Sequence, residues 1–180
     1  AETVNVKFEG NAIADATGKA TAKKNTAYTF TVAKTAGYTY TVTAKNADGD
    51  ITLTESNGTY TIAAKDVIKD ITITVNKTAN RTVEVSEYVK ANNTQFWLVT
   101  VKGTVADGNV LTYNNAPMLW SAKYDAYAYL VIDTTGKTEA QMKTAAEAAI
   151  SEAKGEKTSI SYGGDVNATG TVDVNDAQLV

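Results

Sequence analysis

The sequence contains no histidine and no cysteine, and these two absences exclude several kinds of chemistry. Without these residues the chain cannot build a Ser-His-Asp or Cys-His nucleophile, a Cys/His zinc site, an iron–sulfur ligand set or a disulfide. The net charge of -3 is small and acidic, so no nucleic-acid partner is expected. No run of about 18 apolar residues occurs, so the sequence predicts no membrane insertion.

Alternating apolar and polar residues dominate the first 76 positions, which are rich in threonine and tyrosine. A strict period of two indicates strands with one face packed inward and the other in water. Asp48-Gly49-Asp50 and Asn57-Gly58 are credible hairpin turns, because Asn and Gly tolerate positive φ. Residues 1–77 therefore predict an antiparallel β-sandwich or a related sheet, with short strands at 4–8, 28–32, 38–44, 51–53, 60–62 and 71–75.

The polar stretch 76–81 has no periodic pattern, and we place a short, fairly stiff connection there. The pattern beyond it predicts an α+β module over residues 82–162. Its one helix is expected over 138–154, where Thr138 and Gln141 form a capping box and Gly155 provides a C-terminal stop. The predicted strands of this module, in a mostly antiparallel sheet, are 82–88, 96–102, 110–113, 118–122, 127–132 and 158–162.

The only motif with specific chemistry follows this module, at residues 165–176. These twelve residues fit a calcium loop, with Gly170 at the position of the sharp turn. Calcium takes six to eight hard oxygen ligands, and this spacing wraps oxygen donors around one point. The alternative is an acidic, solvated tail. The predicted ligands are Asp165, Asn167, Thr169, Asp173 and Asp176 through their side chains and Thr171 through its backbone carbonyl.

The same residues, from Gly164-Asp165-Val166-Asn167 to Asn175-Asp176, carry a family resemblance. Residues 164–180 resemble the first calcium repeat of a type I dockerin, a module that docks onto cohesin domains in cellulosome-type systems. The resemblance implies that Val174 and Asn175 contact the cohesin. It covers one of the family's two repeats, so the expectation is a truncated dockerin. Thr169 stands where the family usually has Asp, which implies a weaker calcium affinity.

A second, weaker resemblance lies in the N-terminal module. Gly37-Tyr38, the segment Asn57-Gly58-Thr59-Tyr60-Thr61-Ile62 and the segment 70–75 are similar to repeat modules of Gram-positive surface proteins. Such modules are Ig-like or β-grasp-like spacers, some of them adhesive. The resemblance implies a secreted or cell-surface location.

Aromatic residues and paired acids offer two further interpretations. Trp97, Trp120 and Tyr124 are candidates for sugar stacking, since a pyranose face packs on a flat ring, although large aromatics in strands usually form the core. A glycosidase needs two paired carboxylates. Asp107, Asp125 and Asp133 are candidates, but no pattern pairs them, and catalysis is not expected.

The sequence thus predicts a mainly β protein with one helix. Its expected function is that of a non-catalytic, extracellular assembly or display module, with a Ca²⁺ loop that supports docking to a cohesin domain or a cell-surface scaffold protein. The alternative is a carbohydrate-binding or adhesive surface module, with a polysaccharide partner and a calcium loop that is only structural.

Overall fold

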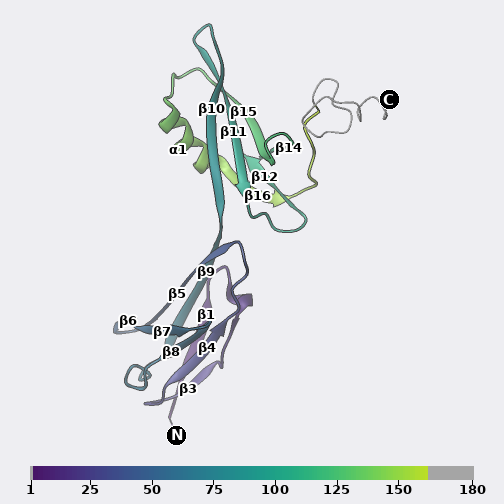
Figure 1. Cartoon of the computed structure of the whole chain (residues 1–180). Coiled ribbons are helices and arrows are strands. Elements are labelled where there is room, and N and C mark those ends of the chain that lie inside the picture. Colours follow the sequence, from purple (N-terminus) through teal and green to yellow (C-terminus); the bar gives the residue numbers. More distant parts are fainter. Residues whose placement is uncertain (1, 162–180) are drawn as a thin grey trace, which may run out of the picture. The chain divides into compact units, whose positions relative to one another are not determined.

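The computed structural model describes residues 2–161, and 57% of these residues are in strands, with one α-helix among them. The fold is therefore mainly β with one helix, as the sequence predicts. The chain divides into two compact units, Ala1–Asn80 and Arg81–Val180, here called the N-terminal and C-terminal units (Figure 1). No described helix is long and apolar enough to cross a membrane.

The N-terminal unit contains two sheets. One has the strand order β3-β1-β9-β5-β6 and the other the order β2-β4-β8-β7. Two 3-10 turns, Ile13–Asp15 and Ala64–Asp66, lie between strands. The strands are β1 (Thr3–Glu9), β2 (Ala16–Thr17), β3 (Thr21–Lys23), β4 (Tyr28–Val32), β5 (Tyr38–Asn46), β6 (Gly49–Ile51), β7 (Leu53–Ser56), β8 (Thr59–Ile62) and β9 (Ile71–Ala79).

One pairing in this unit corrects the expectation of a purely antiparallel sandwich. β1 pairs with β9 in parallel, with Val6 opposite Ile71 and Phe8 opposite Ile73. The first and last strands of the unit therefore lie side by side, while every other strand pair in it is antiparallel.

The core of the N-terminal unit comes from the inward face of each alternating strand. Buried Phe30 stacks on Tyr60 at 5.2 Å between ring centroids and meets the edge of Phe8 at 5.6 Å. Asn57 and Gly58 have positive φ, and they form the β7–β8 turn that the sequence predicts.

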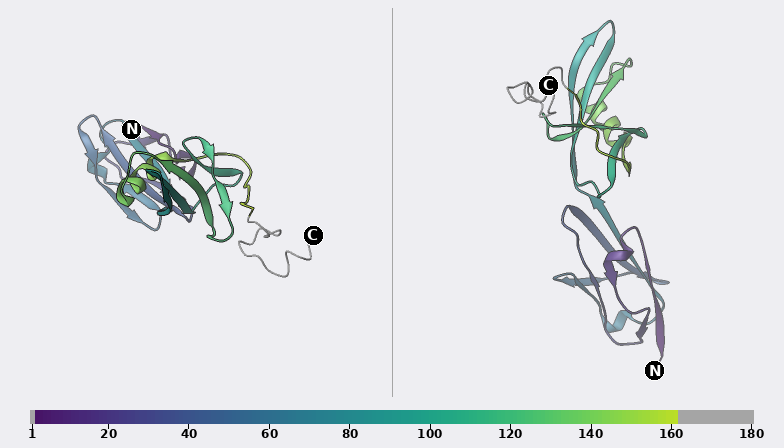
Figure 2. Two further views of the ribbon diagram at one scale, coloured as in Figure 1. Left: turned by 90° about the horizontal axis from the view of Figure 1, so that it is seen from above. Right: turned by 90° about the vertical axis from the view of Figure 1, so that its right-hand side faces the viewer.

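Among residues 81–161, the C-terminal unit has two sheets, both antiparallel, and the helix α1. The helix is drawn in green in Figure 2. The sheet orders are β10-β11-β15-β14 and β13-β12-β16, and α1 contacts β10 and β12. The elements are β10 (Arg81–Ala91), β11 (Thr94–Gly103), β12 (Asn109–Tyr113), β13 (Ala116–Pro117), β14 (Leu119–Ser121), β15 (Ala126–Asp133), α1 (Glu139–Ala149) and β16 (Ile150–Lys154).

The helix begins as predicted but ends earlier. The capping box is present, because Thr138 Oγ1 accepts from the Gln141 N–H and the Gln141 side chain accepts from the Thr138 N–H. The predicted end at Lys154 is wrong: α1 ends at Ala149, and residues 150–154 form β16 against β12. Gly155 follows a strand, not a helix, and its N–H donates to the Gly108 carbonyl at 3.1 Å.

Two other boundaries differ from the sequence prediction. The polar stretch 76–81 is not a connection, because β9 continues to Ala79 and β10 begins at Arg81, which leaves only Asn80 between them. The expected last strand appears, within the described residues, as one parallel bridge between Ser159 and Trp120 of β14.

Candidate functional sites

The predicted calcium ligands and cohesin-contact residues lie outside the described residues. This applies to Asp165, Asn167, Thr169, Thr171, Asp173 and Asp176 and to Val174 and Asn175. Within residues 2–161, no three acidic side chains gather as metal ligands. The calcium loop therefore stays a sequence prediction.

The three aromatic residues singled out for sugar stacking have different environments. Trp97 is 3% exposed and packs in the core of the C-terminal unit, so its ring is not available to a ligand from solution. Tyr124 is exposed in the β14–β15 turn, with Lys123 Nζ at 5.5 Å from its ring centroid. Trp120 is partly buried and borders a cleft. The suggestion that Trp97 stacks on sugar is therefore corrected, and Trp120 becomes the central aromatic residue.

The cleft beside Trp120, here called the Trp120 cleft, has a volume of about 540 Å³. One wall is Gly103 at the end of β11 and the loop that follows, with Asp107 and Gly108, and another is the segment 155–157 that leaves β16. The Trp120 ring meets the buried Tyr127 ring edge-on, with centroids 5.3 Å apart. Lys157 Nζ lies 3.8 Å from the Trp120 ring centroid.

A polar network fixes the loop wall of this cleft. The Glu152 carboxylate on β16 accepts from the Ala106 N–H at 2.7 Å and from Asn109 Nδ2 at 3.0 Å, and it pairs with Arg81. The Arg81 Nε–H donates to the Thr104 carbonyl at 2.8 Å. One acidic side chain thus connects β10, β16 and the loop between β11 and β12, which makes the cleft wall preformed.

The pKa of Glu152 reflects this network. Burial alone would raise the pKa of the carboxyl group, because a charge is costly in a medium of low polarity. The hydrogen bonds from Asn109 and Ala106, together with the Arg81 charge, outweigh burial and lower the pKa below its ordinary value. Glu152 is therefore ionised at neutral pH.

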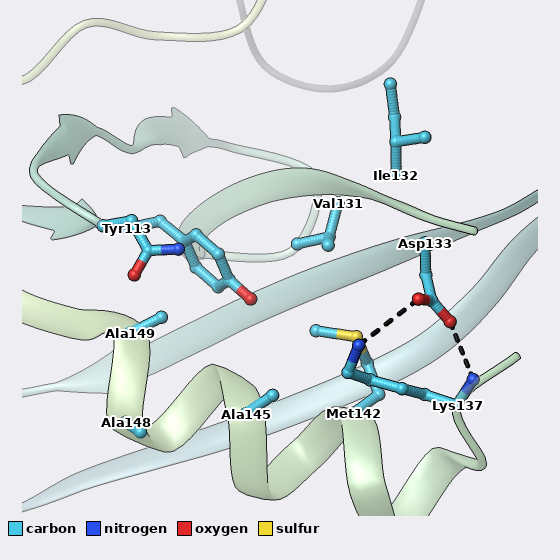
Figure 3. Close-up of a pocket in the computed structure, with 10 residues that line it drawn as sticks. Tyr113, Val131, Ile132, Asp133, Lys137, Met142, Ala145, Ala148 and Ala149 are labelled. Carbon is cyan, nitrogen blue, oxygen red and sulfur yellow. Dashed lines mark hydrogen bonds and ion pairs between the residues drawn. The ribbon is translucent and has the colours of Figure 1, made fainter. Parts of the chain in front are cut away.

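A second hollow, of about 310 Å³, lies between α1 and β15 (Figure 3). Tyr113 and Met142 line it together with Asp133, and the Tyr113 ring stacks on Tyr129 with centroids 4.6 Å apart. Burial raises the pKa of the Tyr113 hydroxyl. Asp133 and Lys137 are the two charged residues on its lining, and they form an ion pair at 3.3 Å.

Asp133 is saturated by donors from its own loop. Its carboxylate accepts from the Thr135 hydroxyl at 2.6 Å, the Thr135 N–H at 3.0 Å and the Lys137 N–H at 2.8 Å. These hydrogen bonds hold the pKa of Asp133 well below its usual range. General acid–base catalysis needs a pKa near the working pH. Asp133 is therefore suited to fixing the β15–α1 connection and not to proton transfer.

The outer face of the sheet β10-β11-β15-β14 carries apolar side chains in cross-strand rows. Phe96 pairs with Ile132 and Leu98 with Leu130, and Ile132 is 64% exposed. Leu119 of β14, opposite Ala128, extends the face. Single exposed apolar residues are common, but a contiguous patch is characteristic of surfaces that contact other macromolecules.

The sequence reasoning missed the residues that shape the Trp120 cleft. Glu152 lies in the segment 138–154 that the sequence predicts as helix, and Lys157 belongs to no predicted motif. No local pattern indicates either contact, because Glu152 is 71 residues from Arg81 in the chain and Lys157 is far from Trp120.

Comparison of the chain with protein-family models, with curated proteins and with solved structures finds no match. The dockerin resemblance and the surface-module resemblance thus rest on the sequence motifs alone.

Proposed function

We propose that this chain is a non-catalytic, extracellular assembly or display module. Its calcium loop supports docking of a parent protein to a cohesin domain or a cell-surface scaffold protein. The observation that carries the proposal is the spacing of oxygen donors in residues 165–176, with Gly170 in register. The dockerin resemblance of residues 164–180 adds the cohesin as partner.

The described part of the chain is compatible with this role. Both units are β-rich, as expected of spacer modules in surface proteins. Asp133, the acidic candidate for which the structure gives a strongly lowered pKa, is saturated by loop donors. These features support display of a binding segment, and the calcium loop supplies the binding chemistry.

Calorimetric titration of Ca²⁺ into the chain tests the proposal. We expect saturable binding of one ion per chain at up to millimolar Ca²⁺, because extracellular modules bind with Kd of about 10⁻⁴–10⁻³ M. Asp165→Asn should abolish the heat, since it removes the anionic ligand at the first loop position. Asp125→Asn makes the same change in an exposed turn of the C-terminal unit and should bind like the parent chain.

Cohesin docking is tested next, with a panel of type I cohesin domains immobilised on a biosensor surface. We expect binding that requires Ca²⁺ and is lost on adding EDTA and on Asp165→Asn. Calcium binding without capture by any cohesin would refute the docking role and leave a structural calcium clip. No heat at millimolar Ca²⁺ would refute the calcium loop itself.

A further inference from the structure

We infer that the Trp120 cleft is a binding site for a neutral glycan, with the Trp120 ring as the stacking surface for a pyranose unit. All residues that line this site lie within the described residues, and none belongs to the predicted calcium loop 165–176. It would give the chain a second binding activity, toward polysaccharide, in addition to protein assembly.

The first observation is that the Trp120 ring is reachable from the cleft. Trp120 is partly exposed and is one of the residues that line the cleft, whereas Trp97 is buried in the core. The Lys157 side chain lies over the ring face, with Nζ at 3.8 Å from the centroid. Lys157 has a flexible four-carbon stem and no ion-pair partner among the described residues, so a ligand can displace it at small cost.

The second observation is that the cleft is preformed and of suitable size. Small-molecule sites commonly enclose about 300–1,000 Å³, and this cleft measures about 540 Å³. Glu152 and Arg81 fix the loop wall through hydrogen bonds to Ala106 and Thr104. A preformed wall reduces the ordering that a ligand must impose, and this raises affinity.

The third observation is the mixed charge of the lining. Asp107 and Glu156 contribute carboxylates that have no hydrogen-bond or ion-pair partner among residues 2–161, and Lys157 contributes an ammonium group. A cationic ligand would meet Lys157, and an anionic one would meet the two carboxylates. A neutral ligand with many hydroxyl groups can donate to the carboxylates, accept from the ammonium and stack its C–H face on the indole. A sugar ring has this combination of properties.

The alternative is that Trp120 and Lys157 only stabilise the fold, with Lys157 packed on the Trp120 ring as a surface cation–π contact. The two roles make different predictions for Lys157→Ala. If the contact is only structural, removing Lys157 changes stability and creates no sugar affinity. If the ring is a stacking surface, removing Lys157 uncovers it and glycan binding is kept or strengthened.

Native affinity electrophoresis of the full chain tests the site, in gels that contain hydroxyethylcellulose, arabinoxylan, glucomannan or soluble starch. Hexasaccharides of a retarding polymer are then titrated while tryptophan emission is followed. Trp97 is buried, so a ligand-dependent change reports on Trp120. Both measurements are made in EDTA, which separates this site from the calcium loop.

We expect retardation by at least one of these polymers, kept or increased in Lys157→Ala. Trp120→Ala should weaken hexasaccharide binding by about tenfold or more. Trp120→Phe, which keeps a ring, should weaken it less and covers the case in which Trp120→Ala does not fold. Tyr124→Ala, which removes an exposed ring outside the cleft lining, should bind like the parent chain.

Three results would overturn the inference. The first is the absence of retardation by all four polymers in both the parent chain and Lys157→Ala. The second is unchanged binding in a folded Trp120→Ala variant. The third is loss of binding in Tyr124→Ala with Trp120→Ala unaffected, which would move the site to the β14–β15 turn.

Discussion

Replacing Glu152 with alanine removes the one side chain that joins Arg81, Ala106 and Asn109. A hydrogen bond to a charged group contributes about 1.5–3 kcal/mol, and breaking a buried ion pair by removing one partner costs about 3–5 kcal/mol. The Glu152 and Arg81 side chains are each 20% exposed, so water partly compensates the loss. We therefore expect Glu152→Ala to lower the free energy of unfolding of the C-terminal unit by about 3 kcal/mol.

Urea unfolding followed by tryptophan fluorescence measures this change, because Trp97 and Trp120 both belong to the C-terminal unit and the chain has no other tryptophan. With a denaturant dependence of about 1.5 kcal/mol per M, the midpoint should fall by about 2 M. Glu156→Ala is the matched control: this carboxylate has no partner among the described residues, and its loss should change stability by less than about 0.5 kcal/mol.

The effect of Glu152 also has a pH dependence of known sign. Its pKa is lower in the folded chain than in the unfolded one, where it is about 4.3. The ionised carboxylate therefore stabilises the fold above that pH, and the contribution is lost as the pH falls below it. The stability difference between the parent chain and Glu152→Gln should be largest at neutral pH and shrink toward pH 3. A Glu152→Ala midpoint equal to that of the parent chain at pH 7 would refute the role of this network.

Three further substitutions test the packing of the two units. Thr138→Ala should lower the free energy of unfolding of the C-terminal unit by about 1 kcal/mol, because the Gln141 N–H loses its acceptor. Urea unfolding followed by tryptophan fluorescence measures this change. Phe30→Ala should lower the free energy of unfolding of the N-terminal unit by about 3–5 kcal/mol and weaken the near-ultraviolet circular dichroism signal of the unit's tyrosines. An unchanged thermal unfolding curve would contradict the core position of Phe30. Gly10→Ala should lower the free energy of unfolding by about 2 kcal/mol or more, because φ at Gly10 is +110° and an added Cβ would lie 2.2 Å from the Val75 carbonyl oxygen. Thermal unfolding followed by circular dichroism measures this change.

Alternation predicts most strands of this chain, because each inward face is buried and a shift by one residue would expose it. It fails where packing far along the sequence decides the outcome. The segment Ile150–Lys154 fits a helical period, yet it pairs with β12 as β16. The parallel pairing of Val6 with Ile71 joins residues 65 positions apart, and no local sequence feature predicts it.

The candidate sites likewise include features that the local sequence predicts and features that only long-range packing determines. On β11, Trp97 points inward and its neighbours Phe96 and Leu98 point outward, so both faces of the strand are apolar and the period alone does not say which ring is buried. The Trp120 cleft depends on contacts with Glu152 and Lys157 that arise only in the folded chain. The calcium loop is the opposite case, since its predicted ligands all lie within twelve consecutive residues and their spacing alone carries the prediction.

The assembly role depends most directly on the calcium loop, and one measurement tests it. Calcium is titrated by calorimetry into the parent chain and into Thr169→Asp, which adds an anionic ligand at the fifth loop position. Affinity in such loops rises with the number of charged ligands, so we expect Thr169→Asp to bind one ion with a clearly lower Kd than the parent chain. The absence of binding by both proteins at millimolar Ca²⁺ would contradict the account.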